Sequence, residues 1–199
     1  KTTTTLNLAY SLKELGKKVL TVDFDSQANL TTCYGVEDTG ALEYTIGHLM
    51  MAQMEEEVTE SFEDYIQSRD GVDYLPSSIY LSVVDAKLRT EMGAERMLAE
   101  VLEPLKSRYD YILIDTPPSL GIITINALTA SNYAVIPTEA GAFSMAGIVQ
   151  VNKTIETVRK HTKPALTVAG VLITKYQKNT RAQAAMKEYI DQLSEAYKH

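Results

Sequence analysis

The chain opens on Lys1-Thr2-Thr3-Thr4-Thr5, which continues directly into the helix-forming run Leu6-Asn7-Leu8-Ala9. A lysine followed by a threonine at the start of a helix forms the right-hand half of the phosphate-binding loop G-x-x-x-x-G-K-[ST]. The left half, with both glycines, would precede Lys1. Because half a motif is weak by itself, the prediction of a phosphate site depends on residues further along the chain. Two aspartates, Asp25 and Asp115, supply that support.

Both aspartates come directly after apolar stretches that read as strands. Residues 2–15 are predicted to form a helix, since leucine and alanine recur at helical spacing and Gly16 follows as a stop. The run 19–24 is then short and rich in branched residues, which indicates a buried strand that ends at Asp25. Residues 109–115 form a second such run, which ends at Asp115 and is closed by two prolines.

The rest of the chain continues this alternation of strands and helices. We expect helices at 45–51, 97–105, 124–130, 144–161 and 180–197, and strands at 72–76, 133–137 and 166–174. Strands that are almost entirely apolar and alternate with helices indicate an α/β fold, in which a mostly parallel sheet has helices on both faces. We expect one domain over residues 1–199.

Composition narrows the class of protein. Apolar residues make up 45% and charged residues 23% of the 199 residues, as in soluble globular domains. No apolar run approaches the length of a membrane span, so no stable membrane insertion is expected. The single cysteine, Cys33, cannot form a disulfide within the chain, which suits a reducing cytoplasm. One cysteine and three histidines also argue against a Cys/His zinc site. The net charge of 19 − 26 = −7 disfavours a wholly nucleic-acid-binding surface, although a local basic patch remains open.

In open parallel sheets, ligands bind beyond the carboxyl ends of the strands, where Asp25, Asp115 and the start of the first helix all lie. There Lys1 would offer an ammonium group to phosphates, and Thr2 and Asp115 would offer oxygen ligands to Mg²⁺. Asp25 could orient or activate an attacking water. Each residue also has a simpler explanation, since Lys-Thr pairs occur by chance and strand-terminal aspartates often only cap helices. For Asp23, a supporting role at the site and a purely structural role stay equally open.

Two stretches carry a family resemblance. The run KTTTTLNLAYSLKELGKKVLTVDFDSQANLT, residues 1–31, resembles the segment after the glycine loop in ParA/Soj chromosome- and plasmid-partition ATPases. The run YDYILIDTPPSLGIITINAL, residues 109–128, is similar to their Walker B strand and its continuation. The resemblance covers nearly the whole chain, and the two motifs together are specific to the ParA/MinD branch of P-loop proteins. It implies a three-layer P-loop NTPase-like fold, binding of ATP with Mg²⁺, and an ATP-dependent homodimer.

The resemblance also implies roles for five residues. By motif position, Lys1 matches the P-loop lysine, which contacts phosphates and serves catalysis, and Thr2 matches the metal-binding threonine. Thr3 matches the next phosphate contact. Asp25 matches the catalytic Walker A′ aspartate, and Asp115 matches the Walker B aspartate that holds the metal.

Members of the family hydrolyse ATP to ADP and phosphate, bind DNA without sequence preference when ATP-bound, and are stimulated by a centromere-binding ParB-type partner. The resemblance therefore implies a cytoplasmic, nucleoid-associated switch for DNA segregation. Lys178 and Asn179 lie near where the family places its adenine pocket. The cations available for DNA, which are equally explained as solvated surface charges, are Arg159, Lys160, Lys163, Lys175, Lys178 and Arg181.

The sequence departs from the family pattern in several places. Ser26 and Ala28 stand where the family usually has proline and glycine. The glycine loop, the signature lysine and the strand before them would precede Lys1, and the family continues past His199. We therefore expect a domain truncated at both ends, which would not bind nucleotide in this truncated form, and whose own hydrolysis stays open.

Two other functions compete with a partition ATPase. A MinD-like membrane-positioning ATPase would need a basic amphipathic helix at its carboxyl end. The expected helix 180–197 instead carries Glu188, Asp191 and Glu195 among its polar residues. A non-catalytic scaffold of the same fold has no need for an acid at Asp25.

Overall fold

The computed structural model describes residues 1–56, 61–139 and 142–175, which belong to two compact units. Unit 1 covers Lys1–Ala130 and unit 2 begins at Ser131. The expectation of one P-loop ATPase domain over residues 1–199 stays a prediction. Among the described residues, no helix has both the length and the apolar character needed to cross a membrane.

Unit 1 is built on a four-stranded sheet with the strand order β2-β3-β1-β4. The central strand β1 runs parallel to both of its neighbours, β3 and β4, whereas β2 pairs antiparallel with β3. The sheet is therefore mostly parallel, as the sequence predicts. The strands are β1 (Val19–Asp23), β2 (Gln67–Arg69), β3 (Val72–Leu75) and β4 (Tyr111–Asp115).

The first helix follows the predicted bounds closely. Helix α1 runs from Thr2 to Glu14, and Gly16 follows with a φ of +76°, a left-handed conformation that glycine adopts without strain. The other helices of unit 1 are α2 (Asn29–Cys33), α3 (Ile46–Met54), α4 (Leu81–Leu88), α5 (Met97–Leu102) and α6 (Ile122–Ala130). Short 3₁₀ turns lie at η1 (Thr39–Ala41), η2 (Ala94–Arg96) and η3 (Glu103–Leu105).

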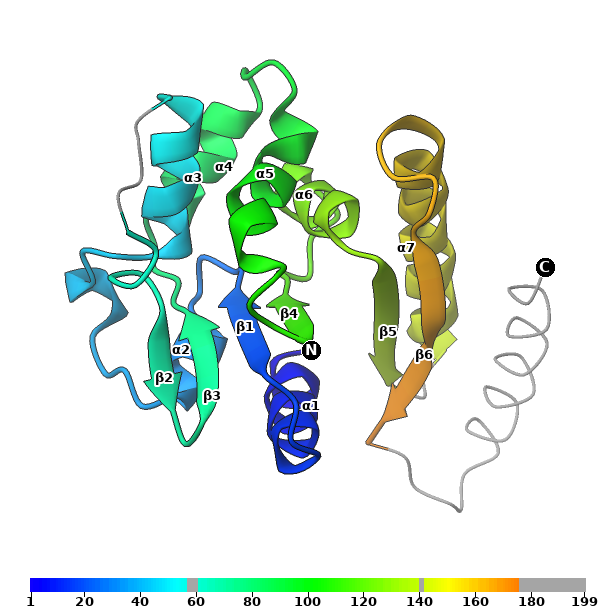
Figure 1. The fold of residues 1–199 in the computed structure, drawn as a ribbon. Coiled ribbons are helices and arrows are strands. Elements are labelled where there is room, and N and C mark those ends of the chain that lie inside the picture. The colour runs from blue at the N-terminus through cyan, green and yellow to red at the C-terminus, as the bar shows by residue number, and fades with distance from the viewer. Residues whose placement is uncertain (57–60, 140–141, 176–199) are drawn as a thin grey trace. The chain divides into compact units, whose positions relative to one another are not determined.

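Helices cover both faces of this sheet. All five residues of β1 are buried, and successive side chains point to opposite faces. Leu20 and Val22 join a large apolar core with α3, α4, α5 and α6, while Val19 packs with Ala9 of α1 and with Tyr34. Figure 1 shows α3 to α6 gathered on the same side of the strands, with α1 on the other. This arrangement confirms the expected α/β class.

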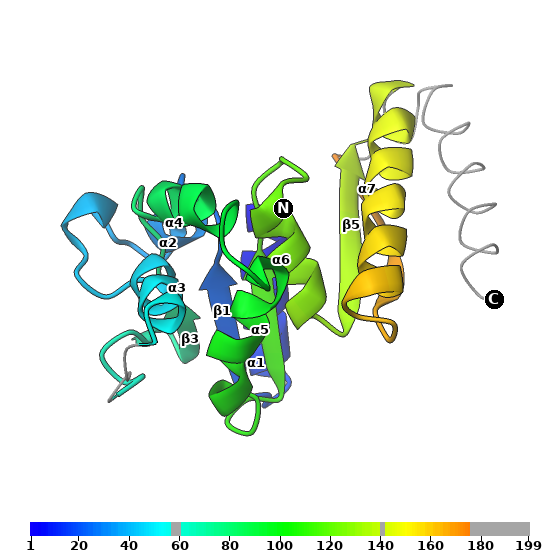
Figure 2. The same ribbon diagram turned by 90° about the horizontal axis from the view of Figure 1, so that it is seen from above.

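Unit 2 contains a pair of parallel strands, β5 (Tyr133–Glu139) and β6 (Thr167–Thr174), joined by α7 (Ala142–His161). Figure 2 shows α7 lying alongside β5. Ile148, Ile155 and Val158 of α7 are buried, as their helical spacing predicts. The expected helix 180–197 lies outside the described residues.

Some expectations for unit 1 were wrong. Strand β4 is not a buried strand, because only Asp115 among its residues is fully buried. The physical reason is its position at the edge of the sheet, with β1 as its one strand neighbour in the described part of the chain. Three elements, α2, α4 and β2, were not among those predicted; α2 and β2, with five and three residues, are too short to show a clear periodicity.

The buried side-chain amide of Asn126 connects α6 to the segment formed by η2 and α5. The Asn126 side chain is fully buried; its Oδ1 accepts a hydrogen bond from the Leu98 amide at 3.0 Å, and its Nδ2 donates to the Ala94 carbonyl at 2.8 Å. We expect Asn126→Ala to lower the free energy of unfolding by about 2–4 kcal/mol, because it leaves buried backbone groups unpaired. Urea denaturation measures this loss. The exposed Asn7→Ala should cost less than about 0.5 kcal/mol, and equal losses in the two variants would contradict this reading of Asn126.

Candidate functional site

Three segments meet at the carboxyl ends of β1 and β4. The register pairs Asp23 with Asp115, and the Phe24 amide donates to the Asp115 carbonyl at 2.8 Å, so the two strands end side by side. Asp25 follows two residues after Asp23, in the turn that leaves the sheet. Helix α1, which begins at Thr2, packs against both strands. The structure thus brings together four of the residues that the sequence singles out.

Asp115 is buried, with 2% of its surface exposed. Burial raises the pKa of its carboxyl group, against the opposing effects of a hydrogen bond from the Thr2 side chain and of the nearby charge of Lys1. Its Oδ1 has no hydrogen-bond partner among the described residues. A buried carboxylate oxygen left unpaired beside a threonine hydroxyl fits a hard divalent cation such as Mg²⁺, which prefers oxygen ligands.

Lys1 lies within electrostatic reach of both carboxylates. Desolvation lowers the pKa of its side-chain amine, while the charges of Asp115 and Asp25 act in the opposite direction. The Lys1 carbonyl accepts the Thr5 amide at 2.9 Å, so the lysine caps the first turn of α1. The amide groups and the dipole at this helix start favour an anion. The amine of Lys1, the hydroxyl of Thr2 and the carboxylates of Asp25 and Asp115 thus lie near one another at the start of α1.

A tight turn holds Asp25 at this edge. The Asp25 Oδ1 accepts the Gln27 amide at 3.0 Å, and the Asp25 carbonyl accepts the Ala28 amide at 2.9 Å. Ala28 has a φ of +51°, in the left-handed region that an alanine adopts at a cost. This is the position at which the family that the sequence resembles usually has glycine, and the positive φ gives the physical reason for that preference.

Asp23 serves the framework of the site. Its Oδ2 accepts both the amide of Thr31 at 2.8 Å and its hydroxyl at 2.7 Å, and the Thr31 Oγ1 in turn accepts the Ser77 amide at 2.9 Å. The carboxylate thereby ties α2 and the segment after β3 to the end of β1. Sequence reasoning missed Thr31 and Ser77, because no periodic or motif signal marks a hydroxyl that acts only through a buried neighbour.

Burial raises the pKa of Asp23 to about 6, although its bonds to Thr31 act in the opposite direction. An unfolded aspartate titrates near pH 4, so between pH 4 and 6 the folded chain holds a proton that the unfolded chain has lost. The contribution of Asp23 to the free energy of unfolding is therefore largest below about pH 4. It falls by about 3 kcal/mol in total as the pH rises through 6.

The variant Asp23→Asn removes this titration while keeping an oxygen that can accept from Thr31. We expect the free energy of unfolding of this variant to increase relative to that of the original chain as the pH rises from 4 to 7. Urea denaturation in the absence of Mg²⁺ measures both values. Asp64→Asn, a change at an exposed aspartate, serves as the control and should follow the original curve. If Asp23→Asn also ran parallel to the original curve, Asp23 would not titrate as described.

Of the three other candidate residues, the structure describes Thr3 alone. Thr3 is exposed, and its carbonyl accepts the Asn7 side chain at 2.7 Å. The adenine candidates Lys178 and Asn179 lie outside the described residues. Their assignments, and those of Lys1, Thr2, Asp25 and Asp115, stay predictions as far as function is concerned.

The candidate DNA-contacting cations of unit 2 differ in whether their side chains already form ion pairs or hydrogen bonds. Arg159 donates to the Leu166 carbonyl and to Glu156, both at 2.7 Å, and Lys175 pairs with Glu139. Lys160 and Lys163 form no ion pair within the part of the chain that the structure describes. Lys178 and Arg181 lie outside it.

The parallel sheet with helices on both faces, entered by a Lys-Thr helix start, defines a P-loop NTPase-like fold. The model of a protein family described as an AAA domain matches residues 1–168 of this chain. The chain belongs to this family, within its ParA/Soj group.

Several related proteins support this assignment. An uncharacterised protein of Mycobacterium tuberculosis is 40% identical over 182 residues, covering 90% of this chain and 55% of that protein. The sporulation initiation inhibitor protein Soj of Bacillus subtilis is 37% identical over 87% of this chain and 67% of its own length. The chromosome partitioning protein ParA of Caulobacter vibrioides is 32% identical over 94% of this chain and 70% of its own length. This chain thus spans about half to two thirds of these relatives.

Solved structures have the same fold. Cobyrinic acid a,c-diamide synthase from Mycobacterium smegmatis, with bound ADP and magnesium, has a TM-score of 0.86 at 31% identity and covers 96% of this chain and 76% of its own. A plasmid partition protein from Borrelia burgdorferi has a TM-score of 0.76 at 27% identity, with 96% and 79% covered. The first of these binds a nucleotide with the metal that the geometry of Asp115 and Thr2 fits.

Proposed function

We propose that the protein is a Mg²⁺-dependent partition ATPase, which hydrolyses ATP to ADP and phosphate and acts as a nucleotide-controlled switch in the segregation of DNA. The observation that carries the proposal is the convergence of Lys1, Thr2, Asp25 and Asp115 at one edge of the sheet of unit 1. Membership of the ParA/Soj group supports the same conclusion.

In this proposal, ATP lies with its phosphates at the start of α1. The Lys1 ammonium contacts the β- and γ-phosphates, Thr3 provides the next phosphate contact, and the helix amides hold further oxygens. The Thr2 hydroxyl and the Asp115 Oδ1, which has no partner among the described residues, would hold Mg²⁺, and the bound ion would neutralise charge on the phosphates. Lys178 and Asn179 contribute to the adenine pocket.

Asp25 acts on the attacking water. Its carboxylate lies beside Lys1 at the open edge of the sheet, and the bond from Gln27 holds its Oδ1 in a fixed turn. A carboxylate held in this way can orient a water molecule and accept its proton as the bond to phosphorus forms. Lys1 stabilises the charge that develops on the transferred phosphoryl group.

The switch proposal extends to partners. The ATP-bound protein pairs as a homodimer, binds DNA without sequence preference and responds to a ParB-type centromere-binding protein. The protein is then cytoplasmic and nucleoid-associated. Of the four candidate cations that the structure describes in unit 2, Lys160 and Lys163 suit DNA best, because Arg159 and Lys175 are already paired.

Co-sedimentation with duplex DNA and with anionic liposomes, each with and without ATP, tests this proposal against a membrane-positioning function. We expect ATP-dependent binding to DNA that weakens steeply with salt, since it rests on neutralising phosphates. Lys160→Gln/Lys163→Gln should weaken DNA binding and reduce its salt dependence. Binding to liposomes but not to DNA would contradict a partition function.

A non-catalytic scaffold is the remaining alternative. A scaffold has no use for a buried, unpaired carboxylate oxygen such as Asp115 Oδ1, whose burial has a cost that a bound cation offsets. The catalytic proposal therefore explains a feature that the scaffold leaves without a purpose.

A further inference from the structure

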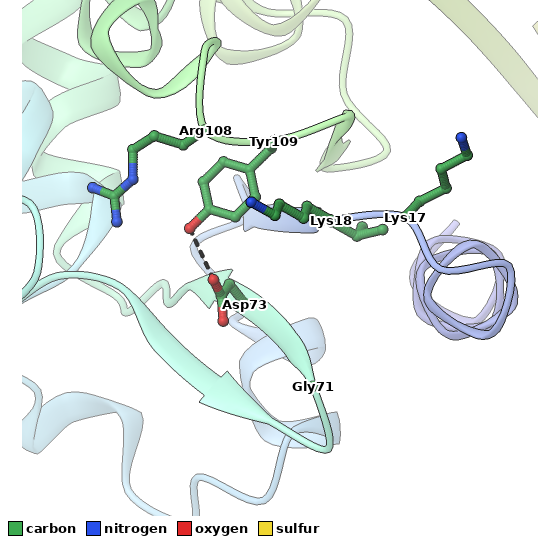
Figure 3. Close-up of a pocket in the computed structure, with 7 residues that line it drawn as sticks. Lys17, Lys18, Gly71, Asp73, Arg108 and Tyr109 are labelled. Carbon is green, nitrogen blue, oxygen red and sulfur yellow. Dashed lines mark hydrogen bonds between the residues drawn. The ribbon is translucent and has the colours of Figure 1, made fainter.

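A second pocket lies at the opposite end of the strands from the proposed ATP site. Its volume is about 490 Å³, and its lining includes Lys17, Lys18, Asp73, Arg108 and Tyr109 (Figure 3). These residues lie at or before the amino ends of β1, β3 and β4, whereas Asp25 and Asp115 follow the carboxyl ends. A strand of five residues separates the two ends by about 13 Å. We call this cavity the basic pocket.

Two of the cations in the basic pocket have no acidic partner. Lys17 and Lys18 form the connection between α1 and β1, and neither forms an ion pair with a described residue. The Lys18 amide donates to Asp110 Oδ2 at 2.8 Å, so the backbone is fixed while the ammonium group stays available. In Figure 3 the Lys18 and Lys17 side chains extend in opposite directions, with Lys18 on the side where Tyr109 and Arg108 lie. These lysines are two unpaired positive charges in a chain whose net charge is −7.

Two acidic groups near the pocket have partners in the structure. Asp73, the one carboxylate in the lining, accepts a hydrogen bond from the Tyr109 hydroxyl at 2.9 Å. Arg108 pairs at 2.9 Å with Glu63, whose side chain is 70% exposed. An exposed pair of this kind contributes little free energy, so an anion in the pocket can replace Glu63 as the partner of Arg108.

We propose that the basic pocket is a second binding site on this protein, for a small molecule that carries phosphate groups. Its volume lies in the range of small-molecule sites. Two lysine ammonium groups act as point charges toward phosphate oxygens, and a guanidinium group can bind them in a fork. Tyr109 provides a flat neutral wall, since burial and the neighbouring Asp73 raise the pKa of its hydroxyl well above physiological pH.

The test measures binding of sodium pyrophosphate to the chain with Lys1→Ala, which removes the phosphate-binding lysine of the proposed ATP site. We expect pyrophosphate to shift the backbone amide resonance of Lys18, which lies in the pocket. Adding Lys17→Gln/Lys18→Gln should weaken this binding by about 10- to 100-fold, as expected for the loss of one to two charge-assisted hydrogen bonds. Arg108→Gln should weaken it in the same direction and serves if the double variant does not fold.

The control is Lys87→Gln/Arg96→Gln, which removes the same charge at residues of unit 1 outside the pocket lining and should leave the affinity unchanged. Equal affinities in the pocket variant and this control would overturn the proposal, as would the absence of pyrophosphate binding. A parallel titration with duplex DNA distinguishes the source of the phosphate. If Lys17→Gln/Lys18→Gln weakened binding of DNA but not of pyrophosphate, the small-molecule site would be excluded.

Discussion

Replacing Asp25 by alanine is expected to leave ATP binding within about twofold of the original protein while lowering ATP turnover by about 10²- to 10⁴-fold. The reason is that Asp25 lies near Lys1 in the turn after β1, where the Gln27 amide holds its carboxylate in a position to act on water rather than on phosphate. Binding is measured by titration with a fluorescent ATP analogue, and turnover by phosphate release.

Asp25→Asn provides the matched control for the turn. Asparagine keeps an oxygen that can accept the Gln27 amide, so the backbone should hold its shape, yet the side chain can no longer take a proton. Turnover should therefore fall as far as in Asp25→Ala. Unchanged turnover in both variants would remove Asp25 from the mechanism.

Replacing Lys1 by alanine is expected to weaken the binding of ATP. Lys1 is the one cation that the electrostatics of the described residues connect to both Asp25 and Asp115. Loss of its charge-assisted contacts to phosphates should weaken ATP binding by about 10- to 100-fold. The same titration measures this change, with the exposed Lys153→Ala as control. Similar affinities in the two variants would show that Lys1 does not contact the nucleotide.

The features that the sequence predicted and the structure contains are those whose position depends on local pattern. Branched apolar runs predict β1 and the strand before Asp115, and parallel strands bring their carboxyl ends to one edge. The convergence of Asp25, Asp115 and the start of α1 therefore follows from periodicity and fold class together. The register of β1 and β4 and the hydrogen bond between Thr2 and Asp115 show this convergence in the structure, while the functional roles of these residues stay predictions.

Other features depend on contacts between distant segments, which no local pattern contains. The hydroxyl of Thr31 supports Asp23 and also the amide of Ser77, 46 residues further along. The basic pocket joins Lys18 to Arg108, two residues that a sequence reading treats as ordinary surface charges. The exposure of β4 depends on which strands flank it, and its apolar sequence is equally typical of a buried strand.

ATP turnover with and without Mg²⁺ tests the central claim most directly, because it requires Lys1, Thr2, Asp25 and Asp115 to act as one site. The measurement uses the complete protein, with EDTA as the metal-free arm and with DNA and the ParB-type partner as additions. We predict hydrolysis of ATP to ADP and phosphate that requires Mg²⁺ and that disappears in EDTA. A protein that neither binds nor hydrolyses ATP in any of these mixtures would contradict the account.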